Sequence, residues 1–338
     1  MGVRSTLLFA AVALCSASPA LASAGGEGPV WSPDGTELAY IGPAPVLAVS
    51  KKTHTLTETH NLNRVLVVPV DGSSGPKAVA TAPRSTTLAE VRWSAGGRFF
   101  YQVTNLFSLR SVDPATGTVT RIGTVGSTGG AGEAFTLSQD GTHVAYTAPC
   151  GCKLPQGNAV RVDGRTLPRP AKADDEGPSF SPDASQVVFS RNGSIVVEPA
   201  AGGPVRALGP SGRQPVWSPD GQWVAFQGRK RQLEAIPLAG GPARTLVPAR
   251  AYGSGVVSYS WSPDATALVF VTDTTLGIVD LFGAVTTYPL PGLRPGANTP
   301  QWSPDGRSIA FTAIRKTADT DVRVYVIGAD GTGLRRVA

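Results

Sequence analysis

The 338-residue sequence is poor in the side chains that carry most chemistry at neutral pH, with only three cysteines and three histidines. It contains no G-x-S-x-G nucleophile elbow, no H-E-x-x-H zinc motif and no phosphate-binding loop. Because the only histidines are His54, His60 and His143, acid–base chemistry would depend mainly on carboxylates. Amphipathic helical stretches of useful length are also missing. These absences argue against α/β hydrolases, common zinc enzymes and helical folds.

Two of the three cysteines lie close together, as Cys150 and Cys152 in the sequence CGC. In an oxidising compartment they could form a tight disulfide, although one intervening residue implies strain. A metal site at this position lacks a second pair of ligands nearby. We therefore predict no resident metal and no cofactor, and we keep the Cys150–Cys152 disulfide as an open alternative.

The N-terminus contains an apolar run, residues 7–14, that is too short to cross a bilayer. It follows Arg4 and precedes the small residues Ala20, Ala22 and Ala24, which is the pattern of a secretory signal. We expect residues 1–24 to be cleaved and the remainder to be exported without a transmembrane segment, to the periplasm, the cell wall or the medium. The formal net charge of +6 is mild, and nucleic acid is not an expected partner outside the cell.

One ten-residue pattern, in contrast to the rare cysteines and histidines, occurs many times in the sequence. The stretch WSPDGTELAY from Trp31 recurs six more times, and the copies begin at Trp93, Leu137, Phe180, Trp217, Trp261 and Trp302. The mean step of about 45 residues and the two-residue alternation within each repeat are typical of one four-stranded propeller blade. The sequence therefore predicts an all-β fold, a single seven-bladed β-propeller of four-stranded antiparallel blades over residues 25–338, with repeats 1 to 7 starting near residues 29, 91, 135, 178, 215, 259 and 300.

The recurring residues have structural rather than catalytic explanations. In the S-P-D-G turn, serine bonds back to the backbone, proline fixes φ, aspartate suits the third position and glycine accepts a positive φ. Ala184 and Ala265 replace that glycine, so their turns should be strained or of another type. One active centre could not use a residue that recurs in every blade, so we assign structural roles to Trp31, Trp93, Trp217, Trp261 and Trp302 as wedges between blades, and to the turn aspartates Asp34, Asp220 and Asp305.

The pattern x-P-x-W-S-P-D-G-x-x-h-A-F, followed by a strand ending in D-G or G-G, resembles the WD-like repeat of TolB-type propellers. Repeat 7, PQWSPDGRSIAFTAIRKTADTDVRVYVIGADGTGLRRVA, matches it from end to end. The resemblance implies an exported, non-enzymatic protein that binds other proteins of the cell envelope. TolB itself combines six blades with a separate N-terminal domain, and this sequence departs from that arrangement.

Candidate site residues lie where the regular pattern is interrupted. An acid precedes four successive inner strands, as Glu27, Glu90, Glu133 and Glu176, and Arg213 takes the equivalent place in repeat 5. We expect these side chains to surround the mouth of the central channel, as an acidic arc that binds a cation or a basic peptide. Ordinary solvated loop charge is the alternative.

The connections between the second and third strands are basic by contrast. Repeat 5 carries Arg229, Lys230 and Arg231 there, and repeat 1 carries an insertion of about twenty residues, 43–64, that includes Lys51, Lys52, His54 and His60. We expect the insertion to form a hairpin over the channel mouth.

The favoured function is a non-catalytic scaffold for a protein or envelope polymer, with its oligomeric state open. The alternative is a lyase or hydrolase that uses channel carboxylates and a metal ion.

Overall fold

The computed structural model describes residues 23–24, 28–49, 56–83, 86–125, 135–149, 157–315 and 322–338. Within these ranges the regular secondary structure is β-strand, apart from one short helical turn, η2 (Thr104–Leu106). No helix in the described part is long and apolar enough to span a membrane. The all-β class expected from the two-residue alternation is confirmed.

Repeats 1 to 3 each form one four-stranded antiparallel sheet in chain order. Repeat 1 gives β2 (Val30–Trp31), β3 (Glu37–Val49), β4 (Leu56–Pro69) and β5 (Lys77–Thr81). Repeat 2 gives β6 (Leu88–Trp93), β7 (Phe99–Val103), β8 (Ser108–Val112) and β9 (Val119–Thr124). Repeat 3 gives β10 (Phe135–Leu137), β11 (Val144–Pro149), β12 (Asn158–Val162) and β13 (Arg165–Thr166).

Repeats 4 and 5 are joined into one continuous seven-stranded sheet. Its strands are β14 (Asp175–Phe180), β15 (Gln186–Arg191), β16 (Ser194–Pro199), β17 (Arg206–Trp217), β18 (Trp223–Gly228), β19 (Leu233–Pro237) and β20 (Arg244–Val247). The first half of β17 pairs with β16, and the second half, from Gly212 to Trp217, pairs with β18. One strand is therefore both the outer strand of repeat 4 and the inner strand of repeat 5.

Repeats 6 and 7 form the last two sheets. Repeat 6 gives β21 (Ser258–Trp261), β22 (Ala267–Val271), β23 (Leu276–Asp280) and β24 (Val285–Tyr288), with β1 (Ser23–Ala24) paired to β21. Repeat 7 gives β25 (Leu293–Pro295), β26 (Gln301–Trp302), β27 (Ser308–Arg315), β28 (Arg323–Gly328) and β29 (Arg335–Arg336). Both β25 and β26 pair with β27, so the inner strand of this repeat is interrupted.

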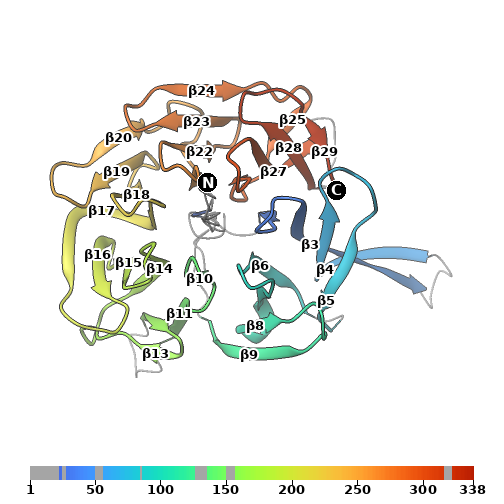
Figure 1. Ribbon diagram of the computed structural model, residues 1–338, viewed down its shortest axis with the longest axis horizontal. Coiled ribbons are helices and arrows are strands. Elements are labelled where there is room, and N and C mark those ends of the chain that lie inside the picture. Colours follow the sequence, from blue (N-terminus) through green and yellow to red (C-terminus); the bar gives the residue numbers. More distant parts are fainter. Residues whose placement is uncertain are drawn as a thin grey trace, which may run out of the picture.

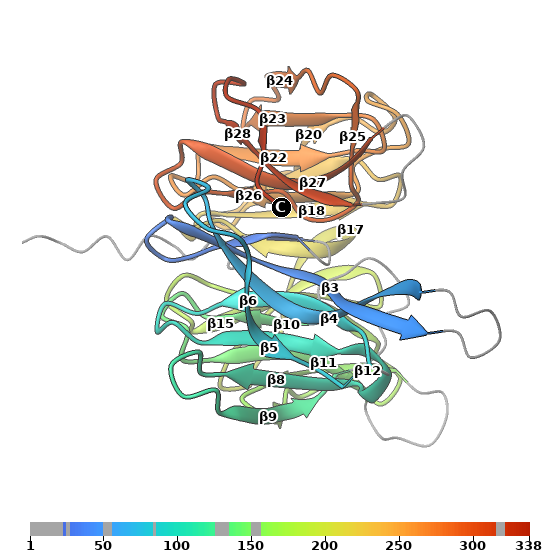
Figure 2. The same cartoon turned by 90° about the vertical axis from the view of Figure 1, so that its right-hand side faces the viewer.

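The sheets stand around a central axis, as seen along that axis in Figure 1 and from the side in Figure 2. The architecture is a β-propeller built from four-stranded antiparallel blades. The described strands form six sheets rather than the seven separate blades that the repeats predict, because β17 continues from one repeat into the next. The seven-blade count is thus not confirmed by the strand pairing.

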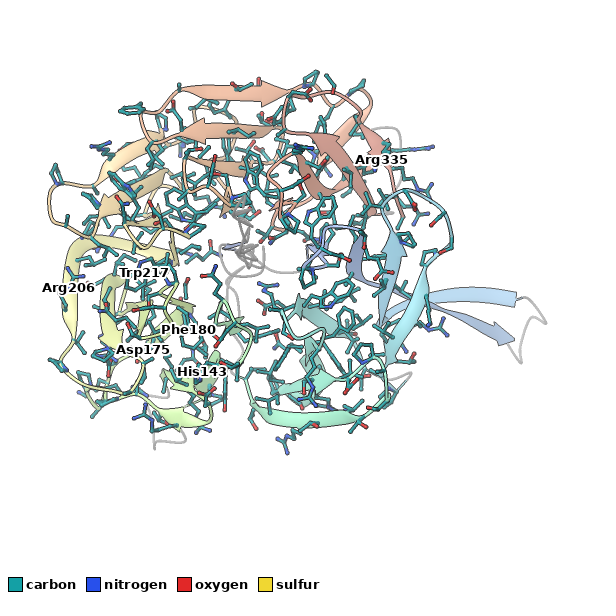
Figure 3. The ribbon with its side chains drawn as sticks, viewed as in Figure 1. His143, Asp175, Phe180, Arg206, Trp217 and Arg335 are labelled. Atoms are coloured by element: carbon teal, nitrogen blue, oxygen red, sulfur yellow. The ribbon has the colours of Figure 1, made fainter. Side chains whose placement is uncertain are left out.

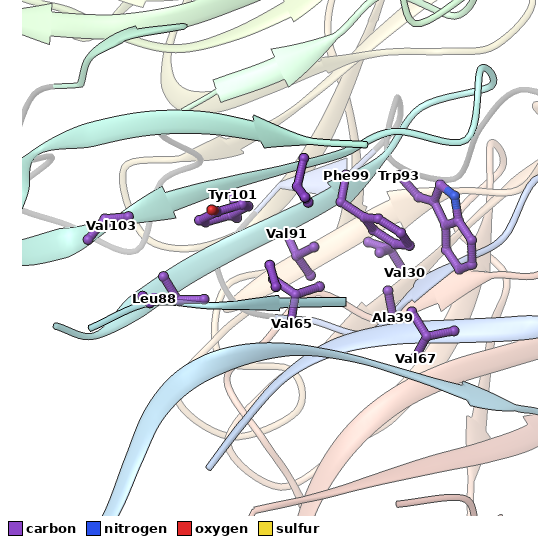
Figure 4. Packing of buried hydrophobic residues seen from close by; sticks show 13 residues of the cluster. Val30, Ala39, Val65, Val67, Leu88, Val91, Trp93, Phe99, Tyr101 and Val103 are labelled. Carbon is purple, nitrogen blue, oxygen red and sulfur yellow. The ribbon is translucent and has the colours of Figure 1, made fainter. Parts of the chain in front are cut away.

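The core lies between the sheets, where neighbouring faces cover each other. Between repeats 1 and 2, for example, Val30 and Val65 pack with Val91, Trp93 and Phe99 (Figure 4). The five repeat tryptophans are 2–8% exposed, and each aromatic ring buries on the order of 150–250 Å². Two of these indoles reach the preceding repeat, because Nε1 of Trp31 donates to Gln301 O and Nε1 of Trp261 donates to Val216 O. These contacts agree with their expected role as wedges.

The S-P-D-G turns close through the hydrogen bonds that their residue types predict. In repeat 5, Ser218 Oγ donates to Asp220 Oδ1 at 2.5 Å, and Trp223 N donates to Ser218 Oγ at 2.9 Å. The fourth residue has a positive φ even where it is not glycine, at 57° for Ala184 and 59° for Ala265. The two alanine turns therefore keep the same shape and hold a strained backbone, which is the first of the two outcomes expected for them.

The ring closes by packing between the first and last repeats. Trp31, Leu38 and Val68 share one buried cluster with Ala310 and other residues of repeat 7. Arg335 Nη2 adds a hydrogen bond to Val70 O at 3.0 Å. The first and last blade strands pair within their own repeats, β2 with β3 and β29 with β28, whereas the N-terminal β1 pairs with β21 of repeat 6. No strand is exchanged between the two ends of the described ring.

Candidate binding site between repeats 4 and 5

A polar hollow with a volume of about 440 Å³ lies between the blades of repeats 4 and 5. It is lined by Asp174, Glu176, Ser190, Asn192, Gly193, Gly212, Arg213, Gln227 and Arg229. These residues come from the ends of β15 and β18 and the turns that follow them, from the start of β14, and from the middle of β17, where its pairing changes from β16 to β18. Successive antiparallel strands alternate in direction, so these turns and strand segments lie on one face of the propeller.

The wall formed by repeat 4 is acidic. Asp174 precedes β14, and its Oδ1 accepts a hydrogen bond from Asn158 N at 2.7 Å. The backbone N–H of Asp174 donates to Asn192 Oδ1, which fixes the adjoining turn against the strand. Burial raises the pKa of Glu176, the nearby Asp174 charge raises it further, and Arg213 opposes both. Glu176 is therefore a carboxyl group that gains from a positive charge placed beside it.

The wall formed by repeat 5 is basic, with the exposed side chains of Arg213 and Arg229. Arg229 Nη2 donates to Ser211 Oγ at 3.2 Å, which directs its guanidinium along β17. Among the residues that the structure describes, no ion pair joins either arginine to Asp174 or Glu176. Opposite charges thus face each other across the hollow without closing it.

Neutral polar groups line the remainder of the hollow. Ser190 is buried and its Oγ donates to Gly212 O at 2.9 Å, whereas Gln227 donates from Nε2 to Val256 O at 2.5 Å. A Cβ on Gly212 would lie 2.5 Å from a ring carbon of Phe226 and 2.8 Å from Gln227 O. Glycine is therefore required at this point, where β17 passes close to β18.

The inner strands β14 and β17 each contain an irregularity in strand pairing, at equivalent places in the two repeats. The pairing register shifts between Glu176 and Ser179 in β14, and between Arg213 and Val216 in β17. The residues that follow the two charged positions, Gly177 and Gln214, have positive φ values of 61° and 52°. A bulge turns the side chain beside it away from the regular alternation, so equivalent bulges place Glu176 and Arg213 on the hollow.

A buried ion cluster supports the acidic wall from behind. Arg191 Nε and Nη2 contact both carboxylate oxygens of Asp175, at 2.7 and 3.0 Å, and Nη2 lies 3.5 Å from Glu198 Oε2. Asp175 and Arg191 are opposite each other in the β14–β15 register, next to the Glu176–Ser190 pair. Because adjacent strand residues point to opposite faces, this cluster faces repeat 3 while the hollow faces repeat 5. Figure 3 labels Asp175, at the start of β14, and Arg206, at the start of β17 on the outer side of the ring.

The structure brings together three of the residues singled out in the sequence, Glu176, Arg213 and Arg229. Lys230 and Arg231 lie in the same turn but do not line the hollow. Glu90 is 3% exposed and forms an ion pair at 3.0 Å with the equally buried Arg92, so it faces a neighbouring side chain rather than open solvent. Glu27, Glu133, Lys51, Lys52, His54, Cys150 and Cys152, and the side chain of His60, lie outside the described residues.

The insertion in repeat 1 continues the β3–β4 hairpin, with pairing as far as Val49 and Leu56. In Figures 1 and 2 the two strands extend outward beyond the ring and do not cover the channel. The expectation of a flap over the channel mouth is therefore wrong. Strands of 13 and 14 residues continue in the direction in which they leave the blade, and a bulge between Gly42 and Pro43 changes that direction only locally.

Sequence reasoning missed Asp174, Ser190, Asn192 and Gln227, which complete the hollow. Their positions in the sequence could have indicated them, because each lies within two residues of one end of β14, β15 or β18, close to Glu176 or Arg213. In the described ranges, no group of three or more His, Cys, Asp or Glu side chains is placed to hold a metal ion.

A second hollow, with a volume of about 400 Å³, lies between the same two repeats on the face of the S-P-D-G turns. Its carboxylates, Asp183 and Asp220, are already engaged by serine hydroxyls of their own turns at 2.6 and 2.5 Å. We therefore place the candidate site on the opposite face, where the charged groups remain available.

Comparisons with known proteins agree on the architecture. No protein-family model matches the chain. No curated protein matches it either.

Among solved structures, virginiamycin B lyase from Staphylococcus aureus aligns with a TM-score of 0.56 at 13% identity, over 86% of this chain and 92% of that one. A chain of the mitotic checkpoint complex aligns with a TM-score of 0.54 at 20% identity, over 76% and 80%. The fold is a β-propeller.

A putative TolB from Agrobacterium tumefaciens is also similar to this propeller, with a TM-score of 0.44 at 16% identity over 78% of this chain and 84% of that one. Because this TM-score is below 0.5, the fold assignment uses only the lyase and checkpoint-complex structures. Identities this low show a shared fold alone, because propellers with unrelated activities share it.

Proposed function

We propose that this chain is an exported, non-catalytic binding scaffold that holds a protein or cell-envelope partner on the face containing the hollow. The observation that carries the proposal is the hollow itself, with an acidic wall from β14 and a basic wall from β17 and β18. Charged groups held apart on a rigid scaffold are suited to recognition by complementary charge. We also propose that the ring has seven blades, since the seven-stranded sheet divides at β17 into two four-stranded units that share this strand.

The β3–β4 hairpin supports the choice of face. As the connection between the second and third strands of repeat 1, it lies on the same face as the β15–β16 and β18–β19 turns. Its strands of 13 and 14 residues are about twice as long as most other strands of the ring. A two-stranded ribbon has no core of its own and is marginally stable in water, so a partner that packs against it would supply the missing burial.

The test replaces residues 43–62 by an Asn-Gly turn, which joins the blade strands directly. We expect the shortened protein to keep its circular-dichroism spectrum and melting temperature and to lose the partner recovered with the full chain by cross-linking from envelope extracts. A matched control is Phe282→Ser, which changes a 91%-exposed side chain in the β23–β24 turn on the opposite face. Retention of the partner by the shortened protein, or equal loss in the control, would contradict the proposal.

A lyase or hydrolase that uses carboxylates is the second candidate, and it is favoured by one observation. Glu176, whose pKa is raised by burial and by Asp174, has the character of a general acid in a concave site. This function requires turnover that falls by two orders of magnitude or more in Glu176→Gln, and bound metal in the purified protein. The scaffold requires neither, so elemental analysis and a substrate screen separate the two.

A further inference from the structure

We propose that the hollow between repeats 4 and 5 binds a small zwitterionic ligand, an amino acid or short peptide with free ends, with its ammonium group on Asp174 and Glu176 and its carboxylate on Arg213 and Arg229. The inference depends on the proposed function only in placing recognition at this hollow. It assigns the ligand chemistry, which the scaffold proposal leaves open.

The sign of the charges decides against simpler ligands. A lone cation at the acidic wall would face Arg213 and Arg229, and a lone phosphate or sulfate at the basic wall would face two carboxylates. In each case like charges remain opposite the ligand, and such juxtapositions oppose binding. Only a ligand with both charges satisfies both walls.

The spacing of the charged groups also favours a ligand with both charges. The two arginines and the two acids form no ion pair with one another in the described ranges, although Arg213 is near enough to lower the pKa of Glu176. A gap between opposite charges is stabilised when a dipolar group fills it. Arginine suits the carboxylate end of such a ligand, because its planar guanidinium donates two parallel hydrogen bonds.

The size and polarity of the hollow fit a ligand of this class. Its volume of about 440 Å³ lies within the range of roughly 300–1,000 Å³ common for small-molecule sites. Between the charged walls, the Asn192 amide and the Gln227 amide, whose Nε2 is held by Val256 O, provide acceptors and donors for a peptide backbone. Gly193 and Gly212 have no side chains that would fill the space.

Isothermal titration calorimetry with trialanine tests this assignment on the full chain. Trialanine should bind. N-acetyl-trialanine and trialanine amide, which each lack one charge, and the doubly blocked peptide, which lacks both, should bind at least about tenfold more weakly. Equal binding of the blocked peptides, or no binding of trialanine at millimolar concentration, would overturn the proposal.

Two variants locate the charges. Glu176→Gln should reduce the preference for trialanine over its N-acetyl form, with Asp174 retaining part of it, whereas Arg213→Gln should reduce the preference for trialanine over its amide, with Arg229 retaining part of it. Arg206→Gln, at the outer rim near the opposite face, is the matched control and should keep the full discrimination. If both site variants retain the discrimination of the unaltered protein, the hollow is not the site.

The outcomes distinguish this inference from the scaffold proposal. Loss of the cross-linked partner on shortening the hairpin, together with no peptide binding, would overturn the ligand assignment and leave the scaffold in place. Peptide binding with the partner retained by the shortened protein would overturn the scaffold and leave the ligand site.

Discussion

At the scale of single residues, the turn aspartates combine a geometric role with an electrostatic one. Ser138 and Thr142 hydroxyls donate to Asp140, and these hydrogen bonds, the serine first, lower the pKa of Asp140 from 3.8 to about 2. The same serine and backbone partners lower the pKa of Asp34 and Asp183. The ionised carboxylate is thus part of the folded turn.

The sign of this shift gives a pH prediction. Because the pKa of Asp140 in the folded state lies below its value in the unfolded chain, its stabilisation is present above about pH 4 and is lost as the pH falls towards 2. We expect urea unfolding of the protein to show a midpoint that decreases over this range. Asp140→Asn should weaken the decrease, and an identical pH profile in the variant would contradict this role.

The residue scale also shows why part of the candidate site was predictable. Glu176 and Arg213 were recognised because each stands four residues before the aromatic residue that begins the turn of its repeat, and equivalent positions in a repeat occupy equivalent places in space. Glu90 instead stands three residues before Trp93, at the place of Gly177 and Gln214, and like them it has a positive φ, of 56°. Arg92, two residues further on, neutralises Glu90 and lies over the ring of Phe135, so the pair is buried. The pairing of a side chain with its neighbour is not visible in the repeat pattern.

At the scale of the strands, the Asp175–Arg191–Glu198 cluster connects stability to the site. Glu198 and Asp175 are fully buried, and burial raises the pKa of Glu198 above its usual value. Glu198 Oε1 has no hydrogen-bond partner in the described part of the chain. Of the side chains that the structure describes, Arg191 is therefore the one cation that contacts these two buried carboxylates at the interface with repeat 3.

Removing that cation should have two measurable effects. Arg191→Met leaves two buried carboxylates uncompensated, and we expect the free energy of unfolding in urea to fall by about 3–5 kcal/mol. Because Arg191 fixes the end of β15 beside Asp175, trialanine should also bind more weakly. Arg165→Met, which removes an exposed guanidinium bonded to backbone oxygens of residues 200 and 201, is the control. A change below about 1 kcal/mol in Arg191→Met would show that the cluster is dispensable.

Strands and turns could be predicted from the sequence wherever the repeat was intact, but the joining of repeats 4 and 5 could not. The segment RALGPSGRQPVW contains Gly209, Pro210 and Gly212, which ordinarily indicate a break between strands. In the structure β17 continues through them, because its two halves pair with different neighbours. Tertiary pairing thus overrides local signals, and it also sets the bulges that complete the hollow.

At the scale of the whole molecule, each blade covers apolar faces of its neighbours. The buried cluster between repeats 6 and 7 includes Val269, Leu276, Ile309 and Phe311, and repeat 7 packs against repeat 1 through Trp31 and its neighbours. No blade can be lost without exposing two such interfaces.

A chain ending at residue 290, which lacks repeat 7, tests this dependence. We expect it to associate or precipitate through the exposed faces, and to unfold at lower urea concentration than the full chain. Size-exclusion chromatography with light scattering measures the first effect, and tryptophan fluorescence the second. A monomeric product with an unchanged midpoint would show that the blades are independent.

The twelve-residue strand shared by repeats 4 and 5 has a mechanical consequence. In the described ranges no other strand belongs to the blades of two successive repeats, whereas β17 is paired by backbone hydrogen bonds on both sides, with β16 and with β18. If the ring opens, we expect it to open between its first and last repeats, which share no strand in the described ranges. Side-chain hydrogen bonds across that interface include Trp31 Nε1 to Gln301 O and Arg335 Nη2 to Val70 O. Amide protons in the second half of β17 should then be among the slowest to exchange with deuterated solvent. The hollow between repeats 4 and 5 should keep a constant width while the opposite side of the ring opens.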